Sequence, residues 1–341
     1  MKTQKKVIVL ALIISVVLML SKFTAYFITS SNAILTDAAE SIVNVLASSF
    51  AFYSIYLSAL PKDQNHPYGH GKVEFFSMFV EGILIALAGI LIIFKSSYNL
   101  IYPNNVSSLF EGSVIIGFTG AINFALGKYL INKSKGLNSI TLYADGKHLI
   151  TDAYSSAGLV LGLLLIQYTG IKFLDGVLSI GLGVYIIFSG YKLIRKSVGG
   201  LMDESDFDRI EEVIEILNTN RRDPWIDVHN LRSQRYGPDF HIDCHVTLPY
   251  YFDLNHVHEE ISQIDTLINR KGTIRTEFFI HTDPCLPQCC HYCRMNNCGV
   301  RNEPKTMDIE WTTRNLTRNF KHFDQEKPEI LATTAGRGVF E

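Results

Sequence analysis

Six long apolar segments fill the first 195 residues and constrain the fold more than any other feature. They lie near residues 7–29, 33–60, 75–101, 112–132, 139–168 and 173–194. Each is long enough to cross a bilayer, which requires about 20 residues of helix. The first segment is too long, and too soon followed by a second, to be a cleaved signal peptide. We therefore predict a polytopic α-helical membrane protein with six transmembrane helices.

Lysine and arginine residues gather on one side of these segments. The residues concerned are Lys2, Lys5, Lys6, Lys62, Lys72, Lys128, Lys133, Lys135, Lys192, Arg195 and Lys196. On the other side, the connections near 30–32 and 102–111 hold neither residue type, and the one near 169–172 holds only Lys172. By the positive-inside rule we expect a multi-pass protein of the cell membrane whose N- and C-termini are both cytoplasmic.

The rest of the chain is mixed and charged, as in a soluble domain. Helical patterns over 206–220 and 255–269 alternate with strand-like patterns over 226–237, 240–248 and 273–284. This αββαβ order predicts helices on one face of a three-stranded sheet. The expected domains are 1–198 (six transmembrane helices), 199–285 (cytoplasmic α+β domain), 286–303 (a Cys-rich extension) and 304–341 (a polar tail).

Two of the apolar segments carry polar stripes at the spacing i, i+3, i+7. The stripes are Asp37, Glu40 and Asn44 in the second segment and Asp145, His148 and Asp152 in the fifth. An ionised group facing lipid costs roughly 2.5–3.5 kcal/mol near the bilayer centre, but it is tolerated around a bound ion. Because residues four apart are neighbours on a helix, Glu40, Asn44, His148 and Asp152 could converge on one divalent ion. Asp37 and Asp145 would lie nearby.

The alternative for these stripes is helix packing through hydrogen bonds across the bundle. The matched double pattern, with four carboxylates and one His, favours the metal site. Glu81 and Asn123 are also polar and intramembrane, but each stands alone in its segment. For these two residues we favour the packing role.

Four stretches carry a resemblance to a known family: ESIVNVLAS, DQNHPYGHGKVE, ADGKHLITDAYSS and FLDGVLSIGLGVYIIFSGYKLI. Through them, the sequence from residue 7 to about 285 resembles the cation diffusion facilitators, which are divalent-metal/proton antiporters. The resemblance implies six transmembrane helices, a cytoplasmic metallochaperone-like domain and a homodimer. It also implies proton-coupled efflux of divalent transition metals by alternating access.

The resemblance places the family's transport site at Glu40, Asn44, His148 and Asp152. The fifth-helix pair matches the family pattern, whereas the second-helix pair departs from the usual Asp or His followed by Asp. The transported metal therefore stays open among Zn, Mn, Fe, Co, Ni and Cd. His148 is the expected proton carrier, because an unperturbed imidazole titrates near pH 6.5 and competes with metal there.

The loop between the second and third segments holds Asp63, His66 and His70. An HxxxH pattern beside a carboxylate suits a zinc site. The alternative is a solvated loop with pH-sensitive histidines. The resemblance favours metal, because this loop holds a secondary site in some relatives. It also implies a charge interlock between Lys72 and Asp203.

The soluble domain is rich in histidine. By resemblance, metal sites at its dimer interface would use His245, His256, His281 and Asp283, with zinc as the expected ion. Further candidates are His229, His241 and His258.

Five of the six cysteines stand in the stretch CLPQCCHYCRMNNC. The candidate ligands are Cys285, Cys289, Cys290, Cys293 and Cys298, with His291 among them. The cytoplasm is reducing, so disulfides are not expected. Dense Cys and His at short gaps are typical of a thiolate site for Zn²⁺ or an iron–sulfur cluster. The spacing fits no standard pattern, so a redox-sensitive cluster, or one without a role, remains an alternative.

These features predict a secondary active transporter rather than an enzyme, with the lipid bilayer and protons as its partners. The alternative function is a membrane-bound metal sensor whose cytoplasmic domain binds metal, but a sensor needs no intramembrane ligands. An intramembrane metalloprotease would typically carry HExxH, and the sequence has none. The net charge of −2 gives no reason to expect a nucleic-acid partner.

Overall fold

The computed structural model describes residues 2–29, 32–101, 109–169, 173–271 and 276–324. The chain forms two compact units. One contains Met1–Asp203 together with Arg235–Pro238, and the other contains Glu204–Gln234 and the chain from Asp239 onward.

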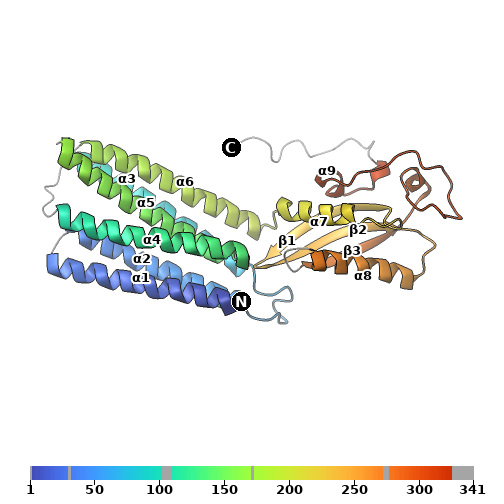
Figure 1. The fold of residues 1–341 in the computed structure, drawn as a ribbon, viewed down its shortest axis with the longest axis horizontal. Coiled ribbons are helices and arrows are strands. Elements are labelled where there is room, and N and C mark those ends of the chain that lie inside the picture. The colour runs from blue at the N-terminus through green and yellow to red at the C-terminus, as the bar shows by residue number, and fades with distance from the viewer. Residues whose placement is uncertain (1, 30–31, 102–108, 170–172, 272–275, 325–341) are drawn as a thin grey trace. The chain divides into compact units, whose positions relative to one another are not determined.

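The first unit is a bundle of six long helices (Figure 1). They are α1 (Lys2–Thr29), α2 (Asn32–Ser58), α3 (Val73–Ile101), α4 (Leu109–Leu137), α5 (Ile140–Thr169) and α6 (Phe173–Leu201). The shortest has 27 residues, or about 40 Å of helix, which is enough to cross a bilayer. The predicted polytopic helical fold is confirmed.

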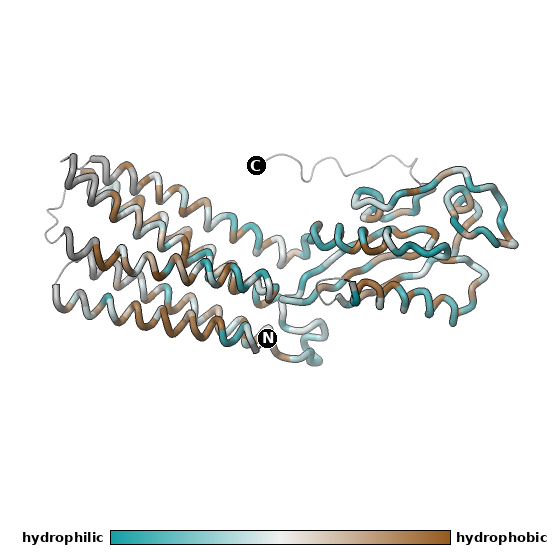
Figure 2. Tube along the Cα trace, viewed as in Figure 1, coloured by the Kyte–Doolittle hydropathy of each residue, from teal (hydrophilic) through white to brown (hydrophobic). Residues whose placement is uncertain are grey.

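Apolar residues run along the helices of the first unit, whereas hydrophilic residues prevail in the second (Figure 2). Among the described residues, Thr3–Thr24, Val73–Tyr98 and Val114–Leu137 are long and apolar enough to cross a membrane on composition alone. The polar stripe of α5 makes that helix less apolar. Such a helix needs protein neighbours to cover its polar face.

Helix α5 occupies a central place in the bundle, because it contacts α2, α3, α4 and α6. Its first turn is held by Glu74 of α3, whose buried carboxylate accepts hydrogen bonds from the backbone N–H groups of Ile140 (3.0 Å) and Thr141 (3.3 Å). The hydroxyls of Ser58 in α2 and Ser139 also donate to this carboxylate, each at 3.1 Å. A carboxylate at a helix N-terminus satisfies N–H groups that lack helical partners. Glu74 thus fixes where the polar stripe of α5 begins.

Three pairs of facing glycines let two pairs of helices approach closely. The pairs are Gly82–Gly190 and Gly89–Gly183 between α3 and α6, and Gly127–Gly146 between α4 and α5. A Cβ atom added to Gly89 would lie 2.8 Å from the carbonyl oxygen of Gly183, and one on Gly127 would lie 2.8 Å from that of Gly146. No side chain fits at such distances, so these positions require glycine.

The second unit is the predicted small α+β domain. Its elements are α7 (Phe207–Thr219), β1 (Asp227–Tyr236), β2 (Asp239–Leu248), α8 (Leu254–Lys271) and β3 (Thr276–Pro284). The sheet order is β1-β2-β3, and β2 pairs with β3 in parallel, which sets His245 opposite His281. Asp206 caps α7 by accepting a hydrogen bond from the backbone N–H of Arg209.

The chain beyond β3 also packs on this domain. It forms η1 (Pro287–His291), α9 (Thr313–Leu316) and η2 (His322–Asp324). Trp311 and Leu316, in the stretch described above as a polar tail, are fully buried in the same core as Ile210 and Ile242. The Arg221 guanidinium lies 3.8 Å from the centre of the Trp311 ring, a cation–π contact. This part of the tail therefore completes the core of the domain.

Candidate metal sites

Asn44 of α2 meets His148 and Asp152 of α5 inside the bundle, and all three side chains are buried. Nδ2 of Asn44 donates a hydrogen bond to Oδ2 of Asp152 at 2.6 Å. Nε2 of His148 lies 3.0 Å from Oδ1 of Asn44 and 3.7 Å from Oδ2 of Asp152. Three of the four predicted transport-site residues are thus side by side. The side chains of the fourth, Glu40, and of Asp37 lie outside the described residues.

Glu81 of α3 lies against the other edge of the same imidazole. Its Oε2 is 3.7 Å from Nδ1 of His148, and the side chain is fully buried. Neither carboxylate oxygen accepts a hydrogen bond from the described residues. The packing role predicted for Glu81 does not account for this proximity, which the prediction missed. A signal existed, because Glu74, Ser77 and Glu81 repeat the i, i+3, i+7 spacing of the other two stripes and are all buried.

Asp145, one turn before His148, is fully buried and accepts a hydrogen bond from the Ser48 hydroxyl of α2 at 3.0 Å. Its Oδ2 has no hydrogen-bond partner among the described residues. Unsatisfied carboxylate oxygens in a water-poor interior are costly unless a cation or proton compensates them. Together, Glu81, Asp145, His148 and Asp152 form an environment that favours a cation with nitrogen and oxygen ligands.

The loop between α2 and α3 brings its predicted residues together. The donor atoms of Asp63, His66 and His70 lie within 4.8 Å of one another. Asp63 Oδ1 is 3.1 Å from His66 Nδ1, and Asp63 Oδ2 is 3.5 Å from His70 Nε2. The backbone N–H of His66 also bonds to Asp63, and this contact lowers the pKa of the carboxyl. The loop therefore offers one carboxylate and two imidazoles to an ion.

Lys72 and Asp203 form an ion pair within the first unit. Nζ of Lys72 lies 2.9 Å from Oδ1 and 3.0 Å from Oδ2 of Asp203. Both groups are half-buried, so water screens their attraction only in part. The ion pair links the residue directly before α3 to the second residue after α6.

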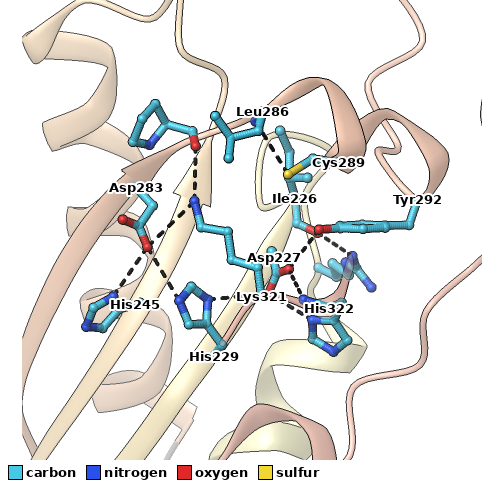
Figure 3. A network of polar contacts seen from close by, with 12 residues as sticks. Ile226, Asp227, His229, His245, Asp283, Leu286, Cys289, Tyr292, Lys321 and His322 are labelled. Atoms are coloured by element: carbon cyan, nitrogen blue, oxygen red, sulfur yellow. Dashed lines mark hydrogen bonds and ion pairs between the residues drawn. The ribbon is translucent and has the colours of Figure 1, made fainter. Parts of the chain in front are cut away.

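A third cluster lies on the sheet of the second unit, with one residue from each strand. The donor atoms of His229 (β1), His245 (β2) and Asp283 (β3) lie within 4.8 Å of one another. Oδ2 of Asp283 is 3.5 Å from His229 Nε2 and 3.3 Å from His245 Nδ1 (Figure 3). His281 is close as well, with Nε2 at 3.8 Å from Asp283 Oδ1. His256 lies instead 2.8 Å from Asp253 and is exposed.

Behind this cluster, Asp227 orients His229. Oδ1 of Asp227 is 3.5 Å from Nδ1 of His229, which leaves Nε2 facing Asp283. Tyr292 donates to Asp227 at 3.0 Å, and His322 donates from its backbone N–H at 2.9 Å (Figure 3). Burial acts to raise the pKa of Asp227, but hydrogen bonds from His229 and His322 outweigh it and lower the pKa. A carboxylate on the second nitrogen of a metal-ligating His is the usual support for such a ligand.

The five cysteines of the stretch CLPQCCHYCRMNNC line one pocket of about 300 Å³. Burial raises the pKa of Cys285, Cys289 and Cys293, so these thiols are protonated at neutral pH unless a metal binds them. The sixth cysteine, Cys244, lies apart in the core. His291 pairs with Glu303 at 2.8 Å.

Comparison with known proteins agrees with this architecture. Residues 8–202 match the family model of the cation efflux transmembrane domain, and 203–285 match that of the cation efflux protein cytoplasmic domain. A transporter of Synechocystis sp. is 32% identical over 252 residues, which cover 74% of this chain and 81% of the relative. The cation-efflux pump FieF of Salmonella paratyphi A is 27% identical over 276 residues, covering 79% and 88%. The FieF pump of Shewanella oneidensis is 26% identical over 264 residues, covering 77% and 88%. With a buried polar site on α2 and α5 inside the matched membrane domain, the chain belongs to the cation diffusion facilitators, a family of multi-pass cation efflux transporters.

Proposed function

We propose that this transporter exports a divalent first-row transition metal from the cytoplasm in exchange for protons. The observation that carries the proposal is the buried contact of Asn44, His148 and Asp152. An imidazole nitrogen with carboxylate and amide oxygens suits Zn²⁺, Mn²⁺, Fe²⁺, Co²⁺, Ni²⁺ or Cd²⁺. Glu40, one turn before Asn44, would add a second carboxylate from α2.

Proton exchange follows from the chemistry of these ligands. An imidazole and a carboxylate must each lose their proton to bind a metal ion, so protons and metal compete for the same groups. Protons taken up from outside would release the ion there, and the ion would displace them again on the cytoplasmic side. Alternating access around a fixed midplane site would separate the two steps.

The oligomer we propose is a homodimer in the cell membrane with both termini cytoplasmic. The distribution of Lys and Arg supports this orientation. The match of residues 203–285 to the family's cytoplasmic domain supports association through that domain. We propose zinc as the ion for the Asp63–His66–His70 loop and for the His229–His245–Asp283 cluster, where the donors already lie close together. The ion pair of Lys72 and Asp203 would act as the interlock of each protomer.

The test is transport into proteoliposomes that contain the purified full-length protein. Each of the six metals is offered with and without an imposed pH gradient, and a metal-sensitive dye inside the vesicles reports uptake. We expect gradient-driven uptake that His148→Ala abolishes while the dimer persists on size-exclusion chromatography. Asn123→Ala, which truncates a buried amide of α4, is the control and should transport normally. Metal binding without any uptake would instead favour a membrane-bound sensor.

A further inference from the structure

The pocket in the Cys-rich extension lies largely beyond both family matches, which end at residue 285. It is lined by Cys285, Cys289, Cys290, Cys293 and Cys298, together with apolar side chains such as Ile226 and Met295. None of the chain's cysteines forms a disulfide. We propose that this pocket binds an iron–sulfur cluster of the [4Fe–4S] type through four of its thiolates.

The spacing of the sulfur atoms favours a cluster over a single ion. Thiolates around one tetrahedral Zn²⁺ lie about 3.8 Å apart, since each Zn–S bond is about 2.3 Å. Although all five cysteines belong to the described part of the chain, no three donor atoms in this pocket come within 4.8 Å of one another. The five cysteines instead line a cavity of about 300 Å³. A cubane of iron and sulfide is held by four cysteines and keeps their sulfur atoms farther apart than one ion does.

The surroundings of the pocket suit an anionic, sulfur-bound group. The backbone N–H of Tyr250 points at Cys285 Sγ (3.4 Å), and that of Leu286 points at Cys289 Sγ (3.5 Å). Backbone hydrogen bonds to cysteine sulfur stabilise iron–sulfur clusters and set their potential. Apolar side chains such as Ile226 and Met295 form part of the lining, and the apolar shell around such a cluster tunes its potential.

Arg301 holds the loop around the pocket in place. Its guanidinium donates to the carbonyl oxygens of Cys290 (3.0 Å), Cys293 (3.2 Å) and Met295 (2.7 Å). The cysteine loop is therefore fixed before any ligand binds. The guanidinium of Arg301 also lines the pocket where an anionic cluster would sit. None of the described contacts of Arg301 involves a residue of the intramembrane site.

Four ligands are needed and five cysteines are present. Cys285, Cys293 and Cys298 line the pocket from separate points of the chain, and we assign these three as ligands. The fourth is one of the adjacent pair Cys289 and Cys290. The remaining thiol of that pair is left free.

The experiment uses the full-length protein, purified without oxygen and reconstituted with Fe³⁺, sulfide and a thiol that reduces half of the iron. We expect about four iron and four acid-labile sulfide per chain and a broad absorption band in the visible that dithionite bleaches. Cys285→Ser, Cys293→Ser and Cys298→Ser should each lose both the iron and the band. Only one of Cys289→Ser and Cys290→Ser should do so, and Cys244→Ala should retain both.

A second measurement does not depend on variants that could misfold. Alkylation of the wild-type protein, counted by mass spectrometry, should mark about four fewer cysteines after reconstitution. The proposal would be overturned if the protein held one zinc per chain and no labile sulfide, and kept that zinc when iron and sulfide were supplied. The same number of alkylated cysteines before and after reconstitution would also overturn it. Iron that is retained by all five serine variants would do the same.

Discussion

Asn44 and Asp152 share a short hydrogen bond across the interface of α2 and α5, with the amide nitrogen donating to the carboxylate at 2.6 Å. An amide at this position brings a donor and an acceptor but no charge, and it cannot take up a proton. The amide oxygen faces the His148 imidazole. Asn44 therefore adds a ligand to the site without adding negative charge or proton capacity.

We expect Asn44→Asp to tighten binding of Zn²⁺ or Cd²⁺ by at least about tenfold, because a third carboxylate would attract the ion in a poorly screened site. With two carboxylates so close, one should hold a proton until metal binds. Metal binding to the variant should therefore depend more steeply on pH. The measurement is competition among the metals at fixed pH, with Asn123→Asp as the control. Identical affinity and ranking in wild type and variant would remove Asn44 from the ligand set.

Glu81→Gln tests whether the carboxylate beside Nδ1 positions His148. Loss of such a support typically costs 10- to 100-fold in metal affinity, so we expect the KM for metal to rise by about that factor. A purely packing role predicts no change, since Gln is nearly isosteric. The pH profile of transport should shift in the variant. Glu81→Asp should recover part of the affinity if the charge is what matters.

If metal transport is coupled to proton transport, the initial rate of metal uptake should fall when an ionophore collapses the pH gradient. The reason is that protons must reach His148 and the carboxylates to release the ion. The measurement compares initial rates at equal metal gradients with and without the ionophore. Equal initial rates with and without the ionophore would contradict the exchange of metal for protons. Vesicles with the His148→Ala variant supply the background rate.

The cysteine pocket should be dispensable for basal transport, because its lining comes from the second unit and lies mostly beyond the matched family domains. We expect the combined Cys289, Cys290 and Cys293 to serine variant to transport at close to the wild-type rate in proteoliposomes. Loss of all transport in a variant that still forms the wild-type oligomer would tie the pocket to the transport cycle.

Trp311→Ala should destabilise the cytoplasmic domain by about 3–5 kcal/mol, the usual cost of emptying a large buried aromatic site. Urea unfolding can be followed by fluorescence in the full-length protein, because Trp225 also lies in this domain and the chain has only these two tryptophans. Met307→Ala, which truncates an exposed side chain of the same segment, should have little effect. Equal stability of both variants would contradict a structural role for the tail.

The sequence was sufficient for the helices and for the α5 stripe, because both are local patterns with a fixed period. The sequence was insufficient wherever a site depends on which face a helix turns to its neighbour or on which strands pair in the sheet. Glu81 faces His148 only through the packing of α3 on α5, and His229 joins His245 only through the order of strands in the sheet. Trp311 stands in a polar stretch, and no periodicity marks it as part of a core.

The glycine pairs of α3 and α6 have a mechanical consequence. Gly82 and Gly89 are seven residues apart, as are Gly183 and Gly190, so the two helices touch along about two turns. Sliding one helix along the other would drive side chains into the opposite backbone at both points. The two helices must therefore travel as one body. Glu81 directly precedes Gly82 in the chain, so a displacement of α6 together with α3 would carry Glu81 toward or away from the imidazole of His148.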